Sequence, residues 1–354
     1  MTGTLSRNFG SDNVTPACAP ILAAINAANE GTANSYGADE YTERLTALAR
    51  QVFETDLAIY PVATGTAANA LALAQIAPPY GGVYCHDGAH IVTDECGAVE
   101  AFSGGARLLG LASPSGKIAP GPLAAAIGYA NDMGVHHVRP SAVSVTQATE
   151  LGTVYSLEEL AALTATARQH GLAVHMDGAR LANALVHMDC SPAAATWKSG
   201  IDVLSLGASK NGALCAEAVV FFNPALAQNF DRRRKQAGHL WSKLRYLSCQ
   251  LLAYLHDELW LRNARQANAM AARLGEGLAE VAGARLLQPV QANEIFVALS
   301  ELKIAALERA GFHFYRWPLC TVAEGAAVRL VTSYATTSAD VDDFLHAARL
   351  TPGR

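Results

Sequence analysis

Short apolar runs alternate with longer amphipathic segments from about residue 57 to residue 222 of this chain. Each run has the length and composition of a buried strand, and helical patterns fill the intervals between the runs. This alternation indicates βαβ units, which form a mostly parallel sheet covered by helices on both faces. The seven predicted strands are Leu57–Val62, Gly82–His86, Arg107–Leu111, Ala142–Thr146, Leu172–Asp177, Val203–Leu206 and Ala218–Phe222.

The pattern changes beyond this region. The intervening helices include Thr66–Ala77, Leu123–Ala130 and Leu157–His170, the last opened by Ser156 as a cap. Residues 248–282 form a long Ala- and Leu-rich stretch, which predicts a helical bridge out of the first domain. The elements predicted after it are strand Ile295–Leu299, helix Leu302–Ala310, strands His313–Trp317 and Val328–Thr332, and helix Ala339–Leu350. We therefore expect an N-terminal arm (1–20), a large α/β domain (21–248) and a small C-terminal α+β domain (249–354).

Composition limits the partners that the chain can have. With 354 residues, 51% of them hydrophobic and 16% charged, it predicts a large core and extensive contact between subunits. A net charge of −5 argues against a nucleic-acid partner. The first seven residues lack an apolar signal core and no run approaches 18 apolar residues, so we expect a cytoplasmic protein without a membrane partner. The seven cysteines (18, 85, 96, 190, 215, 249 and 320) show no metal-ligand spacing, which predicts reduced thiols and no metal site.

Two of the predicted strands deliver reactive side chains. One strand enters a loop at Asp177, and the strand Val203–Leu206 is followed closely by Lys210. Parallel strands present such residues at one edge of the sheet, where α/β proteins bind ligands. An aspartate that keeps a pyridinium nitrogen protonated and a lysine that forms a Schiff base are what pyridoxal phosphate requires of a protein. The sequence thus predicts an enzyme that uses this cofactor.

Further residues extend the predicted site. Gly65 and Thr66 follow a strand and open a helix, where free backbone amides attract an anion; such turns are common, but together with Asp177 and Lys210 this one predicts a phosphate cup. His90 lies just past a strand end with acidic neighbours that can tune its pKa. His175 lies within a strand, which favours a core or supporting role.

Two arginines are candidates for holding a carboxylate. Arg180 follows Asp177 by three residues across a turn, so it can serve the cofactor ring oxygen or a substrate carboxylate. Arg329 interrupts an apolar strand, where an unpaired charge is costly. Its two interpretations are a structural ion pair and a bidentate clamp on an amino-acid carboxylate.

Taken together, these residues resemble the low-specificity L-threonine aldolases, which belong to the aspartate-aminotransferase-like, fold-type-I superfamily of pyridoxal-phosphate enzymes. The resemblance covers nearly the whole chain. It is carried by Ser11-Asp12-Asn13, Ser35-Tyr36-Gly37, Thr64 to Asn69, Ala89-His90, His175 to Ala184, Ser209 to Gly212 and Val328 to Thr332. It implies a lyase that cleaves L-threonine or L-allo-threonine to glycine and acetaldehyde.

The resemblance also implies roles for individual residues. Lys210 would bind the cofactor covalently, Asp177 would pair with its pyridinium, and His90 would stack on its ring. The other implied contacts are Gly65 and Thr66 to the phosphate, Ser11, Arg180 and Arg329 to the substrate carboxylate, and Tyr36 to a neighbouring subunit's site. Family members are homotetramers of tight dimers with shared active sites, so we expect the same assembly.

Two departures from the family pattern leave questions open. Many relatives have a Glu-Asn-Thr-His stretch where this chain has Thr146-Gln-Ala-Thr149-Glu150, so the base for the substrate's hydroxyl proton is open between His90 and an ordered water. The glycine-rich stretch that usually follows Arg-Lys is here Gln236 to Lys243, so an inter-subunit phosphate contact near Arg234 and Lys243 is also open. The basic run Arg232–Lys235 is either a solvated helix end or an anion contact.

The alternative functions on the same scaffold are a β-eliminating lyase, a phenylserine-type aldolase and an aminotransferase. A cofactor-binding protein without catalysis is a rival of another class, and a dinucleotide-binding dehydrogenase is a weaker option because no G-x-G-x-x-G follows a predicted strand.

Overall fold

A seven-stranded sheet forms the centre of the large domain, in a computed structural model that describes residues 7–317, 322 and 324–350. The strand order is β1-β7-β6-β5-β4-β2-β3, and only β7 runs antiparallel to its neighbours. The strands are β1 (Ala58–Val62), β2 (Gly81–His86), β3 (Arg107–Leu111), β4 (Arg139–Thr146), β5 (Ala173–Gly178), β6 (Val203–Gly207) and β7 (Glu217–Phe221). The predicted mostly parallel sheet is confirmed, with each strand within three residues of its expected bounds.

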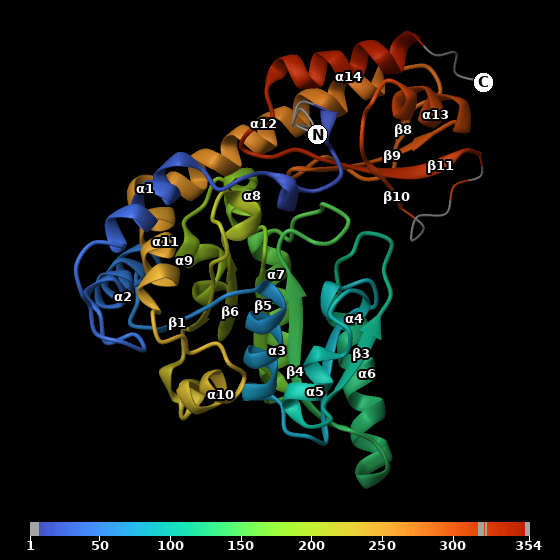
Figure 1. Ribbon diagram of the computed structural model, residues 1–354. Helices are drawn as coiled ribbons and strands as arrows, with labels where there is room; N and C mark the ends of the chain where they lie inside the picture. Colours follow the sequence, from blue (N-terminus) through green and yellow to red (C-terminus); the bar gives the residue numbers. More distant parts are fainter. Residues whose placement is uncertain (1–6, 318–321, 323, 351–354) are drawn as a thin grey trace.

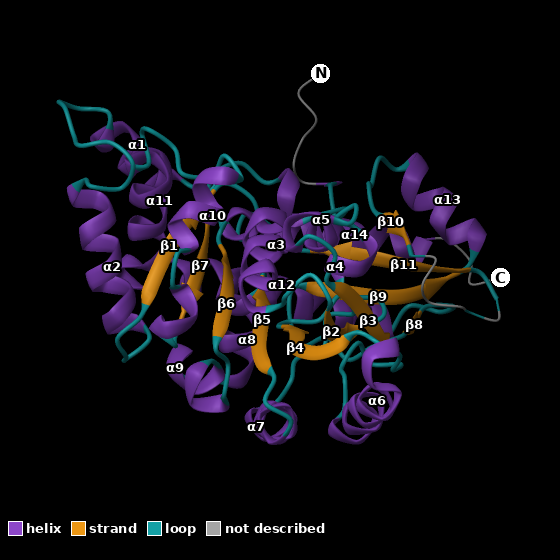
Figure 2. Cartoon of the chain, turned by 90° about the horizontal axis from the view of Figure 1, so that it is seen from below, coloured by secondary structure: helices purple, strands orange, loops and turns teal. Residues whose placement is uncertain are grey.

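Helices cover both faces of this sheet, as Figure 2 shows. One face carries α3 (Gly65–Ile76), α4 (His90–Thr93), α5 (Ala98–Ser103) and α10 (Phe230–Gln236). The opposite face carries α1 (Ala19–Ala28), α2 (Glu40–Val52), α6 (Pro120–Met133), α7 (Leu157–Gln169), α8 (Leu181–Met188), α9 (Pro192–Ala195) and α11 (Arg245–Leu255). Ser156 begins α7 with a capping box that includes Glu159, as the sequence predicts.

Helix α3 lies closest to the sheet because its side chains are small. Every residue from Ala67 to Ala74 is buried, and five of these eight residues are alanine. The helix packs against β6 and β7 on one side and α5 on the other. This close packing fixes the start of α3 at the edge of the sheet where β1 ends.

The small domain is a four-stranded antiparallel sheet covered by helices (Figure 1). Its order is β10-β11-β9-β8, with β8 (Arg285–Leu286), β9 (Glu294–Leu299), β10 (Tyr315–Arg316) and β11 (Ala326–Val331). The helices are α12 (Leu259–Ala279), α13 (Glu301–Arg309) and α14 (Ser338–Leu350). Phe9 from the N-terminal segment packs against Phe312 and Phe344 in its core, so the start of the chain is tied to this domain.

Two sequence predictions need correction here. The predicted helical bridge 248–282 is two helices, α11 and α12, because Asp257 and Glu258 adopt left-handed φ angles of 48° and 54° between them. The predicted strand His313–Trp317 is shorter: β10 pairs with β11 at Tyr315 and Arg316, followed by a bond from the Trp317 N–H to the Ala327 carbonyl, whereas His313 forms a separate bridge with Asn8. The predicted domain boundary at 248/249 falls inside α11, which packs against α1 and α2. The predicted division of the chain into an N-terminal arm, a large domain and a small domain therefore stays a prediction.

Two further sequence observations can be placed on the structure. Within its described part, none of the helices combines the length and apolar character that would let it cross a membrane. Six of the seven cysteines are free thiols there, and Cys320 lies outside the described residues.

Candidate active site

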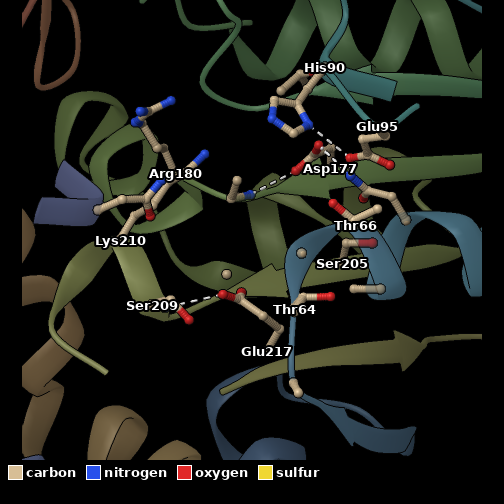
Figure 3. A pocket seen from close by; sticks show the side chains of 18 of the residues that line it. Thr64, Thr66, His90, Glu95, Asp177, Arg180, Ser205, Ser209, Lys210 and Glu217 are labelled. Atoms are coloured by element: carbon tan, nitrogen blue, oxygen red, sulfur yellow. Dashed lines mark hydrogen bonds and ion pairs between the residues drawn. The ribbon is translucent and has the colours of Figure 1, made fainter. Parts of the chain in front are cut away.

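A cavity of about 330 Å³ opens where the parallel strands β4, β5 and β6 end. Figure 3 shows Lys210 and Arg180 on one side of it, with Asp177, His90 and Glu95 on another. Six of the predicted site residues line this cavity: Gly65, Thr66, His90, Asp177, Arg180 and Lys210. Residues that the sequence predicts to act together therefore meet at one edge of the sheet.

The start of α3 forms one wall of the cavity. Thr64 Oγ1 accepts a hydrogen bond from the Ala67 N–H at 3.1 Å, while Gly65 and Thr66 carry the first amides, for which a helix provides no internal partner. A Cβ atom placed on Gly65 would meet nothing within 4 Å, and its φ is not positive. Neither a positive φ nor crowding requires glycine at this position; the absent side chain leaves open space over an anion-attracting helix end.

Asp177 ends β5 and is held by two donors. Its Oδ1 accepts from the Ala179 N–H at 2.9 Å and its Oδ2 from Asn69 Nδ2 at 2.8 Å. Asn69 comes from α3 and donates to Glu95 Oε1 as well, at 2.8 Å. The carboxylate is therefore fixed in orientation from two elements, with only 5% of the residue exposed.

His90 begins α4 and pairs with Glu95. Its Nδ1 lies 2.8 Å from Glu95 Oε1, and this hydrogen bond raises the pKa of His90 although burial opposes the shift. Burial raises the pKa of Glu95, while the bonds from His90 and Asn69 oppose that change. His90 consequently keeps its ring proton to higher pH than a free histidine.

The turn that carries Lys210 is fixed by Glu217, which opens β7. The Ala208 N–H donates to Glu217 Oε2 at 3.0 Å and the Ser209 N–H donates to Oε1 at 3.3 Å. Asn211 donates from the other side to the Tyr254 hydroxyl and to the Trp260 carbonyl. Sequence reasoning missed Glu217; a charged residue at the head of an otherwise apolar strand was the available signal.

His175 lies beneath the cavity floor, buried as the sequence predicts. Its Nδ1 and Nε2 are each 2.9 Å from a serine hydroxyl, Ser144 on β4 and Ser205 on β6. Burial lowers the pKa of His175 to about 4, so the ring is neutral at physiological pH. Ser205 lines the cavity, and His175 thus supports one of its walls.

Arg180 meets two acidic residues that sequence reasoning gave no role. It forms a bidentate pair with Asp12 and lies with Nη1 3.3 Å from Glu294 Oε2. Glu294 Oε1 is 3.8 Å from Arg329 Nη1, so one buried carboxylate lies between the two arginines. Two features of the sequence could have indicated these residues. Asp12 belongs to the Ser-Asp-Asn motif, and Glu294 is an acidic residue in a buried strand.

Three predicted site residues do not line the cavity within the described part of a single chain: Ser11, Tyr36 and Arg329. Ser11 Oγ accepts the Asn13 N–H at 3.1 Å, and Asn13 is itself a lining residue. Tyr36 is 49% exposed, and Lys235 Nζ lies 4.4 Å from its ring centroid. Arg329 stacks on Trp317 at 4.5 Å and donates to the Gly10 carbonyl.

The basic run contains a buried arginine. Arg234 is 5% exposed, donates to the Pro61 carbonyl and pairs with Asp231 at 2.8 Å. Burial lowers the pKa of Arg234, against the influence of Asp231. The interpretation as a solvated helix end is therefore wrong for Arg234. Lys243, the other residue considered for a phosphate contact, is exposed.

Comparisons with known proteins agree with this architecture. The beta-eliminating lyase family model matches residues 8–302. The chain is 43% identical to a low specificity L-threonine aldolase of Pseudomonas aeruginosa, over 98% of this chain and 99% of that protein. It is also 43% identical to a protein of the same name from Pseudomonas sp., over 95% of each chain. A solved structure of Leishmania major threonine aldolase superposes with a TM-score of 0.91 at 29% identity, covering 97% of this chain and 99% of that one. The chain therefore belongs to the beta-eliminating lyase family and, within it, to the low-specificity L-threonine aldolases.

Proposed function

We propose that the protein is an aldehyde-lyase that uses pyridoxal 5'-phosphate to cleave L-threonine, L-allo-threonine and other L-β-hydroxy-α-amino acids to glycine and an aldehyde. One observation carries the proposal. Asp177, Lys210 and the start of α3 surround a single cavity in a chain that matches threonine aldolases over nearly its whole length.

The residues around the cavity fit this cofactor. The open space over Gly65 lies against the free amides of α3, where a phosphate would be held. Asp177 offers an oriented carboxylate to a ring nitrogen, and Lys210 offers a primary amine for covalent attachment. His90 would lie against the ring, with its own orientation fixed by Glu95.

When bound, pyridoxal phosphate provides the electron-accepting ring that allows a bond at the substrate's Cα to break. Asp177 would hold the proton on the ring nitrogen, which makes the ring a stronger electron acceptor. Arg180 would bind the substrate carboxylate through its cavity-facing side, with Arg329 contributing from the small domain. These contacts orient the substrate, and orientation decides which bond at Cα breaks. Lys210 would give way to the substrate's amino group and displace the product amine at the end of turnover.

A homotetramer with shared active sites is part of the proposal. Leu214 lines the cavity and is 58% exposed in a single chain, and Tyr36 presents an exposed aromatic ring. Burial of such side chains against a partner would complete the cavity, and Ser11 and Tyr36 would join the site in that assembly. A cytoplasmic location rests on the sequence alone.

The test is the set of products. Purified protein loaded with pyridoxal phosphate is incubated with L-threonine, L-allo-threonine and phenylserine, and glycine, aldehyde, ammonia and keto acid are measured. We expect glycine and aldehyde in equal amounts. Ammonia with a keto acid in place of glycine would identify a β-eliminating lyase, and a keto acid without ammonia would identify an aminotransferase. A protein that binds the cofactor and converts none of the three would be a binding protein without catalysis.

A further inference from the structure

The loop after β4 presents alternate residues to the cavity. Thr146, Ala148 and Glu150 line it, whereas Gln147 and Thr149 point into the protein interior. Gln147 exchanges two hydrogen bonds of 3.0 Å with the backbone of Tyr155. Thr149 lies at the position where many relatives have a histidine, but here its hydroxyl is buried 2.7 Å from the Thr153 hydroxyl. The loop therefore offers the cavity a carboxylate, Glu150, in place of that histidine.

One oxygen of Glu150 is bonded and the other is not. Oε1 accepts from the His90 N–H at 2.7 Å and from Thr146 Oγ1 at 2.9 Å. Oε2 is buried and has no hydrogen-bond partner within the described part of the chain. A buried acceptor without a donor is unfavourable. The carboxylate is therefore fixed through one oxygen, while its other oxygen has no donor among the described residues.

The surroundings of Glu150 suit proton exchange near neutral pH. Burial raises the pKa of Glu150 to about 7; the negative charge of Asp177 adds to the shift and the His90 N–H bond opposes it. The other titratable groups facing it are Cys85 on β2, Tyr155 beyond the loop and Arg180. A pKa close to the working pH lets one group both accept and release a proton.

Glu150 also borders a second cavity, of about 510 Å³, between the large and small domains. His86 and Asp87 are the other titratable residues that line this second cavity. Glu150 is therefore a lining residue of both spaces.

We propose that Glu150 is the catalytic residue that takes the proton of the substrate's β-hydroxyl group, a role that rests on the proposed aldolase function. The hydroxyl O–H bond breaks and the proton passes to the Glu150 carboxylate. The Cα–Cβ bond then breaks as the aldehyde C=O bond forms, and its electron pair stays with the fragment that becomes glycine. A proton added at Cα completes glycine, and Glu150 loses the hydroxyl proton. One proton has moved from oxygen to carbon overall, and no oxidant or reductant is consumed.

His90 is less suited to this step. Its Nδ1 is engaged by Glu95, and the same hydrogen bond raises the pKa of His90, which favours the protonated ring. A protonated imidazole can donate a hydrogen bond but cannot accept the hydroxyl proton. His90 instead fixes Glu150 through its backbone N–H.

The experiment compares Glu150→Gln with the parent holoenzyme in two reactions. Aldehyde release from L-threonine requires removal of the hydroxyl proton, whereas exchange of glycine's α-proton with deuterated water does not. We expect aldehyde release to fall by about 100-fold or more, the contribution that a general base commonly makes, while glycine exchange stays within about threefold. The rise of kcat/KM with pH around neutrality should also disappear. Glu280→Gln, which changes an exposed carboxylate paired with Arg349, is the matched control.

A second measurement does not depend on activity or on the variant. Glutamate carboxyl groups carrying ¹³C are titrated by NMR in the parent holoenzyme without substrate. One carboxyl should titrate near neutrality, and its signal should be missing from Glu150→Gln.

The proposal is overturned if Glu150→Gln releases aldehyde within threefold of the parent rate, or loses glycine exchange to the same extent. It is also overturned if every glutamate carboxyl titrates in the ordinary acidic range. Failure of the proposed aldolase function can be distinguished from failure of this proposal. In that case the parent holoenzyme itself would release no aldehyde from any β-hydroxy amino acid.

Discussion

Arg180 donates two parallel hydrogen bonds to Asp12, from Nε to Oδ2 at 2.8 Å and from Nη2 to Oδ1 at 3.0 Å. The two residues are 168 positions apart; Asp12 is buried, and 10% of the Arg180 side chain is exposed. Burial alone would raise the pKa of Asp12, but the charges of Arg180 and Lys210 outweigh it and lower that pKa. Asp12 therefore stays ionised and holds the guanidinium in one orientation, in which Nη1 lies 3.3 Å from Glu294 Oε2.

Asp12→Ala should raise the KM for L-threonine and the Kd for glycine more than it changes kcat. The substitution leaves Arg180 without its bidentate partner, and removal of one member of a buried charge pair commonly costs about 2–5 kcal/mol. Steady-state kinetics and glycine binding measure the effect. Asp342→Ala, which breaks an exposed pair with Arg273, is the control and should change neither value. An unchanged KM in Asp12→Ala would show that Arg180 does not depend on this carboxylate.

Lys210→Ala should abolish covalent cofactor attachment and reduce turnover by about 1000-fold or more, which corresponds to roughly 4 kcal/mol of transition-state stabilisation. The reason is that no other lysine lines the cavity among the described residues. Absorbance of the bound cofactor, before and after borohydride reduction, reports the attachment. Lys198→Ala, at an exposed pair with Glu54, should behave as the parent protein does. Turnover within about tenfold of the parent would assign the attachment to a different amine.

Asp177→Asn should still bind pyridoxal phosphate but should slow aldehyde release by about 100-fold or more, a loss of roughly 2.7 kcal/mol. A neutral amide cannot hold the ring nitrogen protonated, although it has a similar size and can accept the Ala179 N–H. Cofactor affinity and kcat are measured on the same preparation. Asn69→Ala removes a donor to Asp177 without removing its charge, so its loss of kcat should be smaller. Equal losses in the two variants would indicate that orientation of Asp177, rather than its charge, limits the reaction.

His175 should make the protein sensitive to acid. The pKa of His175 is lowered by burial from 6.5 to about 4, so the unfolded chain binds this proton at a higher pH than the folded protein does. Stability is therefore unaffected by this residue above pH 6.5 and falls as the pH drops from 6.5 to about 4. The free energy of unfolding should decrease by up to about 3 kcal/mol over that window, at roughly 1.4 kcal/mol per pKa unit.

Urea unfolding at fixed protein and cofactor concentrations, repeated across that pH range, measures the change. His175→Gln can keep one bond to a serine but does not titrate, so the difference between parent and variant isolates the histidine. A pH slope shared by both proteins would mean that other groups cause the acid sensitivity.

The sequence by itself determined the layered architecture and the edge of the sheet where the site lies. Apolar runs with the period of buried strands, separated by helical patterns, are local signals, so all seven strands of the large sheet were found. Parallel strands end at the same edge, and this rule is sufficient to predict that Asp177 and Lys210 lie close together. The Asp-Gly-Ala-Arg and Ser-Lys motifs added the chemistry.

Only the tertiary structure decided which side chains meet. Asp12 and Arg180 pair although 168 positions separate them, and Glu294 meets Arg329 because β9 pairs with β11; no local pattern encodes either contact. The sequence left open which group takes the proton of the substrate hydroxyl, and it gave Glu150 no role. The loop backbone turns Thr149 inward and Glu150 toward the cavity, a direction that side-chain identity alone does not fix. Secondary structure follows from short-range periodicity, whereas the orientation and ionisation of buried groups depend on neighbours that folding brings from distant positions.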